Sequence, residues 1–131
     1  MKLTSLRLIS KDIKAAVEFY EQAIGLSARW YTEDFAELSA DSITIAIGST
    51  QTMKMFSEGL TDFAGTKSII IEFLVKNVDE EYERIKNIAS EIIQEPTTMP
   101  WGNRSLLFCD PDGNMINFFT PVSAEAVKKF S

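Results

Sequence analysis

The chain has 131 residues, 45% of them hydrophobic and 24% charged, proportions typical of a globular protein rather than a disordered or membrane-embedded one. This length gives one domain with a real core and is too short for two ordinary domains. The net charge of −6 argues against a nucleic-acid partner, because nucleic-acid phosphates need a basic surface. No apolar run reaches the length of a membrane span, and the opening MKLTSLRLIS lacks the long apolar region of a secretory signal, so we expect no membrane partner.

Histidine is absent from the sequence, and Cys109 is its only cysteine. The lack of histidine excludes a His-based zinc site, a catalytic triad and a His general base, although a site built from carboxylates alone stays open. One cysteine cannot form an internal disulfide, which indicates a reducing, cytoplasmic location. With no basic neighbour in the sequence, Cys109 is also a poor candidate nucleophile.

The first half of the chain predicts a strand, a helix and three more strands. Asp12 stands where a helix N-cap is expected, and Gly25 suits the position after a helix C-terminus. Between them, apolar residues recur at helical spacing: Ile13, Ala16, Val17, Tyr20 and Ile24. The predicted strands are Leu3–Ile9, Ser27–Tyr31, Phe35–Ser39 and Ser42–Ile47.

The second half predicts the same order of elements after an aperiodic stretch, Gln51–Lys67, which we interpret as a linker. Asn77 is a good N-cap, and it is followed by an apolar helix stripe of Val78, Tyr82, Ile85 and Ala89. Strands are predicted at Ser68–Val75 and Ile92–Gln94, and a loop holds Pro96, Pro100 and Trp101. The tail, Ser123–Phe130, is typical of a short helix that docks through Val127 and Phe130.

Residues 105–119, SLLFCDPDGNMINFF, combine two β-forming runs with a tight turn. Pro111 presets its own φ and Gly113 tolerates a positive φ, so the segment predicts a strand, a turn and a second strand. We expect Asp110 and Asp112 to cap this turn. Asn117 is a polar residue in the middle of the second apolar run, and this makes it a candidate functional residue.

The two halves form a weak internal repeat. Leu6 aligns with Ile71 and Asp12 with Asn77, so that apolar and cap positions agree although identity is low. Such a repeat indicates two copies of one βαβββ unit, since a lone unit cannot bury both faces of its sheet. We therefore expect a single domain, 1–131, made of a first module at 1–50, a linker at 51–66, a second module at 67–121 and a helical tail at 122–131.

Several motifs carry a family resemblance. They are Val17–Tyr20 with Ile24–Leu26, then Phe73–Asp79, Pro100–Gly102 and Asp110–Asn114. On these residues the chain resembles the vicinal oxygen chelate superfamily, which includes glyoxalase I, extradiol dioxygenases and bleomycin-resistance proteins. The combination of PWG and DPDGN is similar to the glyoxalase/bleomycin-resistance branch. The resemblance implies an α+β fold in which two βαβββ modules form a curved, open mixed sheet around a cleft.

The resemblance also implies positions for metal ligands on the first and fourth strands of each module. In this sequence they are Ser5, Ala46 (or Thr44, depending on the register), Ile70 and Asn117. A divalent catalytic metal needs three or more ligands rich in imidazole or carboxylate, and these positions offer at most neutral oxygens. We therefore expect no metal and no cofactor.

The alternation of side chains along a strand places Ser5, Arg7 and Ile9 on the cleft face of the first strand. The same rule places Ile70, Glu72 and Leu74 on the cleft face of the second module. Arg7 and Glu72 are equivalent positions of the repeat, which suggests an Arg7–Glu72 pair across the cleft floor. Such a pair is either a plain ion pair or a site where Arg7 binds an anion and Glu72 binds a cation or acts as a base.

Trp101 and Trp30 are candidates for stacking on a ligand, because an indole face attracts planar rings and cations. The alternative for Trp101 is to cover one end of the core, and for Trp30 it is ordinary core packing. Met53 and Met55 are interpreted as gap-filling or contact residues, and Glu80, Glu81 and Glu83 as a solvated helix face.

Three functions are consistent with these features. The first is a metal-free protein, similar to bleomycin-resistance proteins, that binds a small molecule or drug without catalytic residues, through Arg7, Glu72, Trp101, Asn117 and Trp30. The second is a glyoxalase-like lyase or isomerase using Glu72 and Arg7 in place of the metal, and the third is an interaction protein with a closed cleft. The missing metal ligands favour the first, and the resemblance implies a homodimer.

Overall fold

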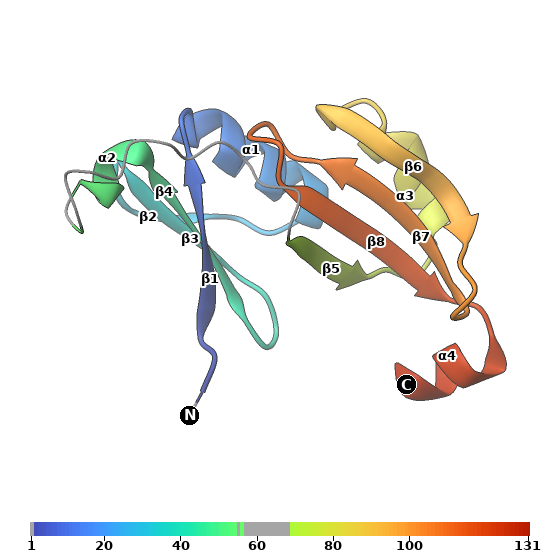
Figure 1. Cartoon of the computed structure of the whole chain (residues 1–131). Coiled ribbons are helices and arrows are strands. Elements are labelled where there is room, and N and C mark those ends of the chain that lie inside the picture. The colour runs from blue at the N-terminus through green and yellow to red at the C-terminus, as the bar shows by residue number, and fades with distance from the viewer. Residues whose placement is uncertain (1, 55, 57–68) are drawn as a thin grey trace. The chain divides into compact units, whose positions relative to one another are not determined.

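The computed structural model describes residues 2–54, 56 and 69–131, and it divides the chain into two compact units, residues 1–65 and 66–131 (Figure 1). Each unit contains a sheet of four strands with helices, and each is described by itself. Met55, residues 57–66 of the predicted linker and the first predicted residue of the following strand, Ser68, lie outside the described residues.

In its described residues, the first unit contains four strands and two helices. Its elements are β1 (Ser5–Ser10), α1 (Ile13–Ile24), β2 (Arg29–Thr32), β3 (Phe35–Ser39), β4 (Thr44–Ser49) and α2 (Thr50–Met53). The strand order is β1-β4-β3-β2, with β1 parallel to β4 and the other pairs antiparallel. Helix α2 is a difference from the prediction, which gave residues 51–53 to an unstructured linker; Ser49 caps it by accepting a hydrogen bond from the Gln51 N–H.

Helix α1 confirms the predicted signals at both of its ends. The Asp12 side chain accepts a hydrogen bond from the Ala15 N–H at 3.2 Å, and Gly25 has φ of 70° in the left-handed region. Four residues of the predicted stripe are buried, with Tyr20 fully so, whereas Ile24 is half-buried. The buried face also includes Phe19 and Ala23, and the helix packs against β1, β3 and β4.

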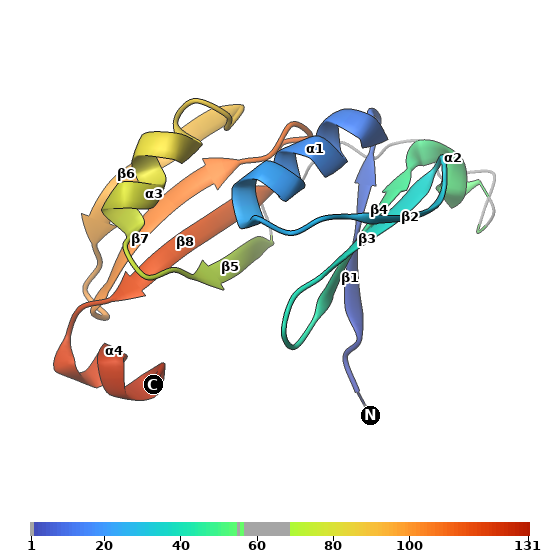
Figure 2. The same cartoon turned by 180° about the vertical axis from the view of Figure 1, so that it is seen from behind.

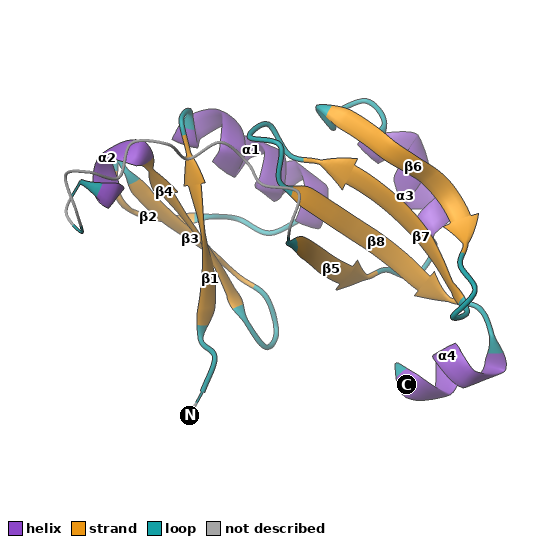
Figure 3. Ribbon diagram, viewed as in Figure 1, coloured by secondary structure: helices purple, strands orange, loops and turns teal. Residues whose placement is uncertain are grey.

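The second unit repeats this order. Its elements are β5 (Ile70–Leu74), α3 (Val78–Ile85), β6 (Glu91–Thr98), β7 (Asn103–Cys109), β8 (Met115–Pro121) and α4 (Ala124–Lys129). The strand order β5-β8-β7-β6 matches β1-β4-β3-β2 position by position. Both units thus have a βαβββ core, as the repeat predicts, and the α+β class is confirmed (Figure 3).

Helix α3 covers one face of the second sheet, where it packs on β6, β7 and β8 (Figure 2). Beneath it, Phe118 makes edge-on ring contacts with Phe73 at 5.7 Å and with Phe108 at 5.0 Å between ring centroids. These apolar side chains alternate along their strands with residues that face the other side of the sheet. The core of the second unit therefore lies between α3 and the sheet, while on the opposite face β8 contributes Asn117 and Phe119, which are also buried.

The turn between β7 and β8 confirms the prediction for Asp110, whose side chain is 1% exposed. Its carboxylate accepts hydrogen bonds from the Asp112 N–H at 2.9 Å, the Asn114 N–H at 2.8 Å and the Asn114 side-chain amide at 2.8 Å. Gly113 has φ of 85°, as expected from the sequence. The buried Asp110 carboxylate thus has a structural role, which is to stabilise the turn.

Strand β6 is longer than predicted and contains Pro96, which the sequence placed in a loop. The pairing of β6 with β7 shifts register between Ile92 and Gln94 and again between Gln94 and Thr97. At such an irregularity on an edge strand no ladder partner needs the N–H that proline lacks. Helix α3 is shorter than its apolar stripe, because it ends at Ile85 and leaves Ala89 outside.

Helix α4 docks differently from the expectation. Ala126 is its buried residue, whereas Val127 is 50% exposed, so docking through Val127 is wrong. Phe130 does pack, with its ring centroid 4.9 Å from that of Phe119. Ser123 caps the helix by accepting a hydrogen bond from the Ala126 N–H.

Candidate functional site

The face of the second sheet that lies away from α3, here called the pocket face, carries most of the predicted site residues of this unit. Along β5, Ile71 is buried, while Ile70, Glu72 and Leu74 are exposed, which confirms the predicted alternation. Phe119 lies two residues beyond Asn117 on β8 and therefore shares its face.

Asn117 and Glu72 are directly paired on the parallel strands β8 and β5. The Asn117 side-chain amide Nδ2 donates a hydrogen bond to Glu72 Oε2 at 2.8 Å. Asn117 is only 9% exposed, and its Oδ1 atom has no hydrogen-bond partner among the described residues. Because only the NH2 end of an amide can face a carboxylate favourably, this bond fixes the orientation of the amide.

A pocket of about 450 Å³ opens on the pocket face beside this pair. It is lined by a carboxylate, an amide, an ammonium group and apolar or aromatic side chains, from Glu72, Leu74, Trp101, Asn103, Phe119, Lys129 and Phe130. Asn103 has a buried Oδ1 atom without a partner in the described part of the chain. The composition, mostly aromatic walls with a few polar groups, is typical of small-molecule sites.

Trp101 reaches the pocket from the turn between β6 and β7, where it is 64% exposed. The core-covering alternative for this residue is therefore wrong. The following Gly102 has φ of 94°, and a Cβ atom there would meet Ser123 Oγ at 2.0 Å. The Gly102 carbonyl also accepts hydrogen bonds from the N–H groups of Val122 and Ser123. The PWG motif thus joins the turn to the start of α4 and sets the position of Trp101 relative to the helix.

Helix α4 supplies the cationic side of the pocket. The Lys129 ammonium lies 5.1 Å from the Phe130 ring centroid, and Phe130 in turn contacts Phe119. Within the second unit, the Asn117 amide is the recorded partner of the Glu72 carboxylate, and no ion pair joins Glu72 to Lys129 among the described residues. The two opposite charges therefore line one pocket without neutralising each other directly.

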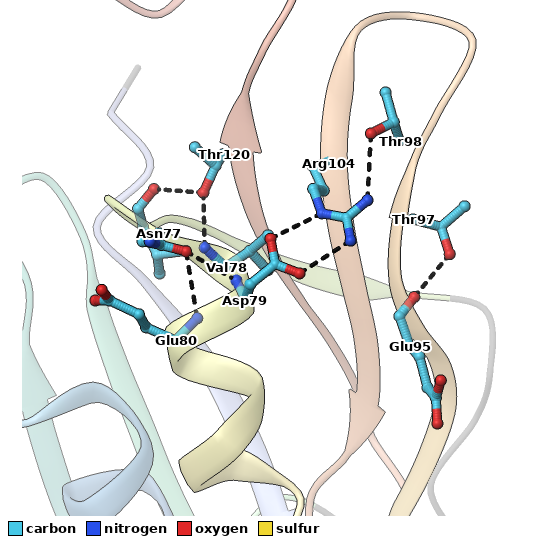
Figure 4. Close-up of polar contacts among 10 residues, drawn as sticks. Asn77, Val78, Asp79, Glu80, Glu95, Thr97, Thr98, Arg104 and Thr120 are labelled. Atoms are coloured by element: carbon cyan, nitrogen blue, oxygen red, sulfur yellow. Dashed lines mark hydrogen bonds and ion pairs between the residues drawn. The ribbon is translucent and has the colours of Figure 1, made fainter.

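The α3 side of the sheet holds the site strands in place (Figure 4). Arg104, next to Asn103 on β7, donates to Asp79 through Nε at 2.8 Å and through Nη2 at 2.9 Å. These bonds lower the pKa of the Asp79 carboxyl and raise that of the Arg104 guanidinium. Thr120, which follows Phe119, donates to the Val75 carbonyl and accepts from the Val78 N–H.

Two other groups, one on α3 and one at its C-terminal cap, have raised pKa values. The Tyr82 hydroxyl donates to Glu95 Oε1 at 3.0 Å, and this bond raises the pKa of the tyrosine. The ion pair with Glu83 raises the pKa of Lys86. The Tyr82 bond joins α3 to β6, and the Lys86–Glu83 pair follows the surface of the helix. Neither group lines the pocket.

In the first unit, Arg7 is exposed on β1, and its guanidinium lies 4.8 Å from the Phe35 ring centroid and 5.6 Å from that of Phe56. It lines a shallow apolar hollow of about 260 Å³ together with Ile9, Met53 and Phe56. The predicted Arg7–Glu72 pair would require a contact between the two units, and it stays a prediction.

Trp30 lies on the edge strand β2, paired with Ala36, and is 42% exposed. Its interpretation as an ordinary core residue is therefore wrong. A role in contacting a ligand stays a prediction.

The residues at the implied metal positions do not fit a divalent catalytic metal. The observed register pairs Ala46 with Arg7 in the first module as it pairs Asn117 with Glu72 in the second, so Ala46 rather than Thr44 is the equivalent of Asn117. The four positions, Ser5, Ala46, Ile70 and Asn117, then offer one hydroxyl and one amide. The Asn117 amide turns its NH2 end to Glu72 and retains one neutral oxygen. Over the described ranges, no three Cys, Asp or Glu side chains gather in a way that would hold a metal ion.

Of the residues that line the pocket, the sequence predicts Glu72 and Trp101 as ligand contacts and does not predict Asn103, Phe119 or Lys129. Alternation from Asn117 would have indicated Phe119, since both occupy the same face of β8. Lys129 had no comparable signal, because its position depends on how α4 docks. Among the described residues, no helix is long and apolar enough to cross a membrane.

The fold and the pocket face define the class of protein. The chain belongs to the Glyoxalase/Bleomycin resistance protein/Dioxygenase superfamily, whose family model matches residues 2–118, and this confirms the resemblance seen in the motifs. Protein YraH of Bacillus subtilis (strain 168) is 28% identical over 125 residues, which cover 91% of this chain and 98% of YraH. The bleomycin resistance protein of Geobacillus stearothermophilus is 30% identical over 125 residues, covering 86% of this chain and 92% of the relative.

Solved structures show the same fold. A glyoxalase/bleomycin resistance protein/dioxygenase family enzyme from Burkholderia phytofirmans PsJN matches with a TM-score of 0.80 and 17% identity, covering 93% of this chain and 100% of its own. A glyoxalase-related enzyme from Fulvimarina pelagi matches with a TM-score of 0.80 and 17% identity, covering 95% and 94% respectively.

Proposed function

We propose that this protein binds a small organic molecule without a catalytic metal, in the pocket of its second unit. The observation that carries the proposal is the pocket of about 450 Å³ with aromatic walls and two polar anchors, Glu72 and Asn103. Volume and lining both suit a ligand of drug size.

The relatives support a drug or drug-like compound as the ligand. The bleomycin resistance proteins of Geobacillus stearothermophilus and Staphylococcus aureus are 30% identical to this chain over most of its length. Binding without turnover agrees with the donor set at the implied metal positions, which provides neither imidazole nor a carboxylate cluster in the described residues. We assign no catalytic residue; Glu72 and Trp101 act as ligand contacts, and Asn117 positions Glu72.

Purified protein tests the proposal in a thermal-shift screen with bleomycin, other glycopeptides and cellular metabolites, followed by calorimetric titration of each hit. A ligand present at a hundred times its Kd stabilises the native state by about 2.7 kcal/mol, which gives a clear rise in Tm. Trp101→Ala is expected to weaken binding about tenfold, since stacking on an aromatic face contributes about 1 kcal/mol or more.

Matched variants locate the ligand. Tyr31→Ala, which removes a half-exposed aromatic residue from β2 in the first unit, is the control and should leave the Kd unchanged. Weaker binding in Trp30→Ala or Arg7→Gln would support the predictions that these residues also contact the ligand. If no compound raises Tm, or if Trp101→Ala binds as tightly as the parent, the pocket assignment is wrong.

Two further measurements address the metal and the reaction. Elemental analysis of freshly purified protein should find zinc, nickel, manganese and iron well below one equivalent per chain. A stoichiometric metal would overturn the metal-free proposal. Incubation with each hit, followed by mass spectrometry and NMR, should return the compound unchanged. A product of different mass in excess over the protein would favour the lyase alternative, and an isomer seen by NMR would favour the isomerase alternative.

A homodimer is part of the proposal. Apolar side chains are exposed on and beside the edge strand β5, where Ile69, Ile70 and Leu74 are 64%, 44% and 53% exposed. Light scattering coupled to gel filtration should report twice the mass of the 14.7 kDa chain. A cytoplasmic location remains our expectation from the single cysteine, and fractionation of cells carrying a tagged copy tests it.

A further inference from the structure

The pocket of the second unit joins a carboxylate to three aromatic side chains, from Trp101, Phe119 and Phe130. Aromatic faces carry partial negative charge and attract cations, most strongly where water is partly excluded. Glu72 adds a full negative charge, and the bond from a nine-tenths buried amide, Asn117 Nδ2, at 2.8 Å restrains this carboxylate. Aromatic walls and a restrained carboxylate together form a receptor for an organic cation.

The pocket also contains a cation of its own. The Lys129 ammonium lies 5.1 Å from the Phe130 ring centroid, a distance at which cation–π attraction operates. Lys129 lines the same pocket as Glu72, and in the described part of the chain it has no carboxylate within ion-pair distance. Its ammonium therefore occupies an aromatic surface that an incoming cation would use, and its charge would repel that cation.

We propose that the pocket selects organic cations, such as quaternary ammonium, protonated amine or amidinium groups attached to an apolar body, and that Lys129 is a built-in competitor for them. This inference rests on the proposed function, because it names the charge class of the ligand that the same pocket takes. Glu72 is the anionic anchor, the three aromatic side chains form the walls, and Lys129 sets the affinity by having to be displaced. A neutral residue at position 129 should then strengthen binding rather than weaken it.

Two probes of opposite charge test the selectivity. Benzyltrimethylammonium and phenylmethanesulfonate carry tetrahedral groups of opposite charge on the same benzyl body, and neither titrates near neutral pH. Binding is followed by fluorescence of the Trp30→Phe variant, in which Trp101 is the only tryptophan. Calorimetry on the unsubstituted chain checks that this background leaves the affinity unchanged. We expect the cation to bind at least about tenfold more tightly than the sulfonate at low ionic strength.

Charge-matched variants separate local from general electrostatics. Glu72→Gln should weaken cation binding about tenfold, whereas Glu125→Gln on α4, with the same charge change outside the pocket lining, should have little effect. Lys129→Met should tighten cation binding by roughly two- to fivefold, and its neighbour control Lys128→Met, which does not line the pocket, should change it by less. Circular dichroism and Tm of each variant show that the fold is retained.

Each alternative outcome overturns the inference. Tighter binding of the sulfonate, an unaffected Glu72→Gln variant, or weaker cation binding in Lys129→Met would each contradict a cation receptor opposed by Lys129. If neither ion binds while another compound raises Tm and needs Trp101, the cation selectivity is wrong and the proposed function stands. If no compound binds at all, the proposed function fails with it.

Discussion

Asn117 donates an amide N–H to the carboxylate of Glu72 across the parallel pairing of β8 and β5, at 2.8 Å. The family resemblance places a metal ligand at position 117, and in this chain the residue instead positions a neighbouring carboxylate. Its remaining oxygen is buried and unpartnered in the described residues. Asn117 thus places a neutral amide at the implied metal position, and it holds the Glu72 carboxylate beside the pocket.

Asn117→Asp should destabilise the protein at neutral pH by about 1–3 kcal/mol, because it replaces a hydrogen bond by two facing carboxylates. The double variant Glu72→Gln/Asn117→Asp should recover much of this loss, since the glutamine amide can donate to the aspartate in a reversed pair. Urea denaturation of the parent, both single variants and the double variant gives the coupling energy of the pair.

The surface variant Gln51→Glu, at an exposed position on α2 of the first unit, is the control for introducing a negative charge into this acidic chain. It should change the urea midpoint only slightly. Equal losses in Gln51→Glu and Asn117→Asp, or a double variant no more stable than Asn117→Asp, would contradict a direct Asn117–Glu72 interaction.

The pocket face was largely predictable from the sequence, because strand geometry alone determines which residues share a side. Once β5 is placed, Glu72 must lie opposite the buried Ile71, and the period of two fixes this whatever the tertiary structure. The turn residues Asp110 and Gly113 were predictable for a similar local reason. The βαβββ repeat followed from caps and apolar periods, which are also local.

The parts that could not be predicted depend on tertiary contacts. Lys129 and Phe130 line the pocket because the residues before α4 pack on Gly102, whose carbonyl accepts hydrogen bonds from the Val122 and Ser123 N–H groups. No local sequence pattern predicts this contact. Pro96 was misplaced because a register shift, rather than a loop, accommodates it in β6. The Arg104–Asp79 bonds likewise join β7 to α3 over a long stretch of sequence.

Gly102→Ala should destabilise the protein more than Gly113→Ala, although both glycines have positive φ, 94° and 85°. A Cβ atom at position 113 meets nothing within 4 Å, so that change costs only backbone strain, about 1–2 kcal/mol. At position 102 the new atom would lie 2.0 Å from Ser123 Oγ and 2.7 Å from Ser123 Cβ, which forces the start of α4 to move. Urea midpoints measure the stability of both variants.

The same pair of glycine variants reports on the pocket. Because α4 carries Lys129 and Phe130, Gly102→Ala should also alter the affinity for any ligand that binds there, whereas Gly113→Ala should not. Equal stability losses in the two variants would show that the Ser123 contact has no energetic consequence.

Arg104→Met should lower stability at neutral pH, and its difference from the parent should shrink as the medium becomes strongly acidic. The Arg104 hydrogen bonds lower the pKa of Asp79 in the folded state below its ordinary value of 3.8. A carboxyl group with a depressed folded pKa contributes stability above the unfolded value, and this contribution is lost as the pH falls through the folded pKa. Exposure of both side chains keeps the effect modest.

Thermal midpoints of the parent and Arg104→Met, measured from about pH 7 down to about pH 2.5, should therefore converge as the pH falls below the ordinary carboxyl pKa of 3.8. Arg84→Met, whose pair with Glu81 lies within α3, is the control and should lose less at pH 7, because it ties no strand to the helix. A gap between parent and Arg104→Met that stays constant across the acid range would mean that the methionine acts through packing rather than through the Asp79 carboxylate.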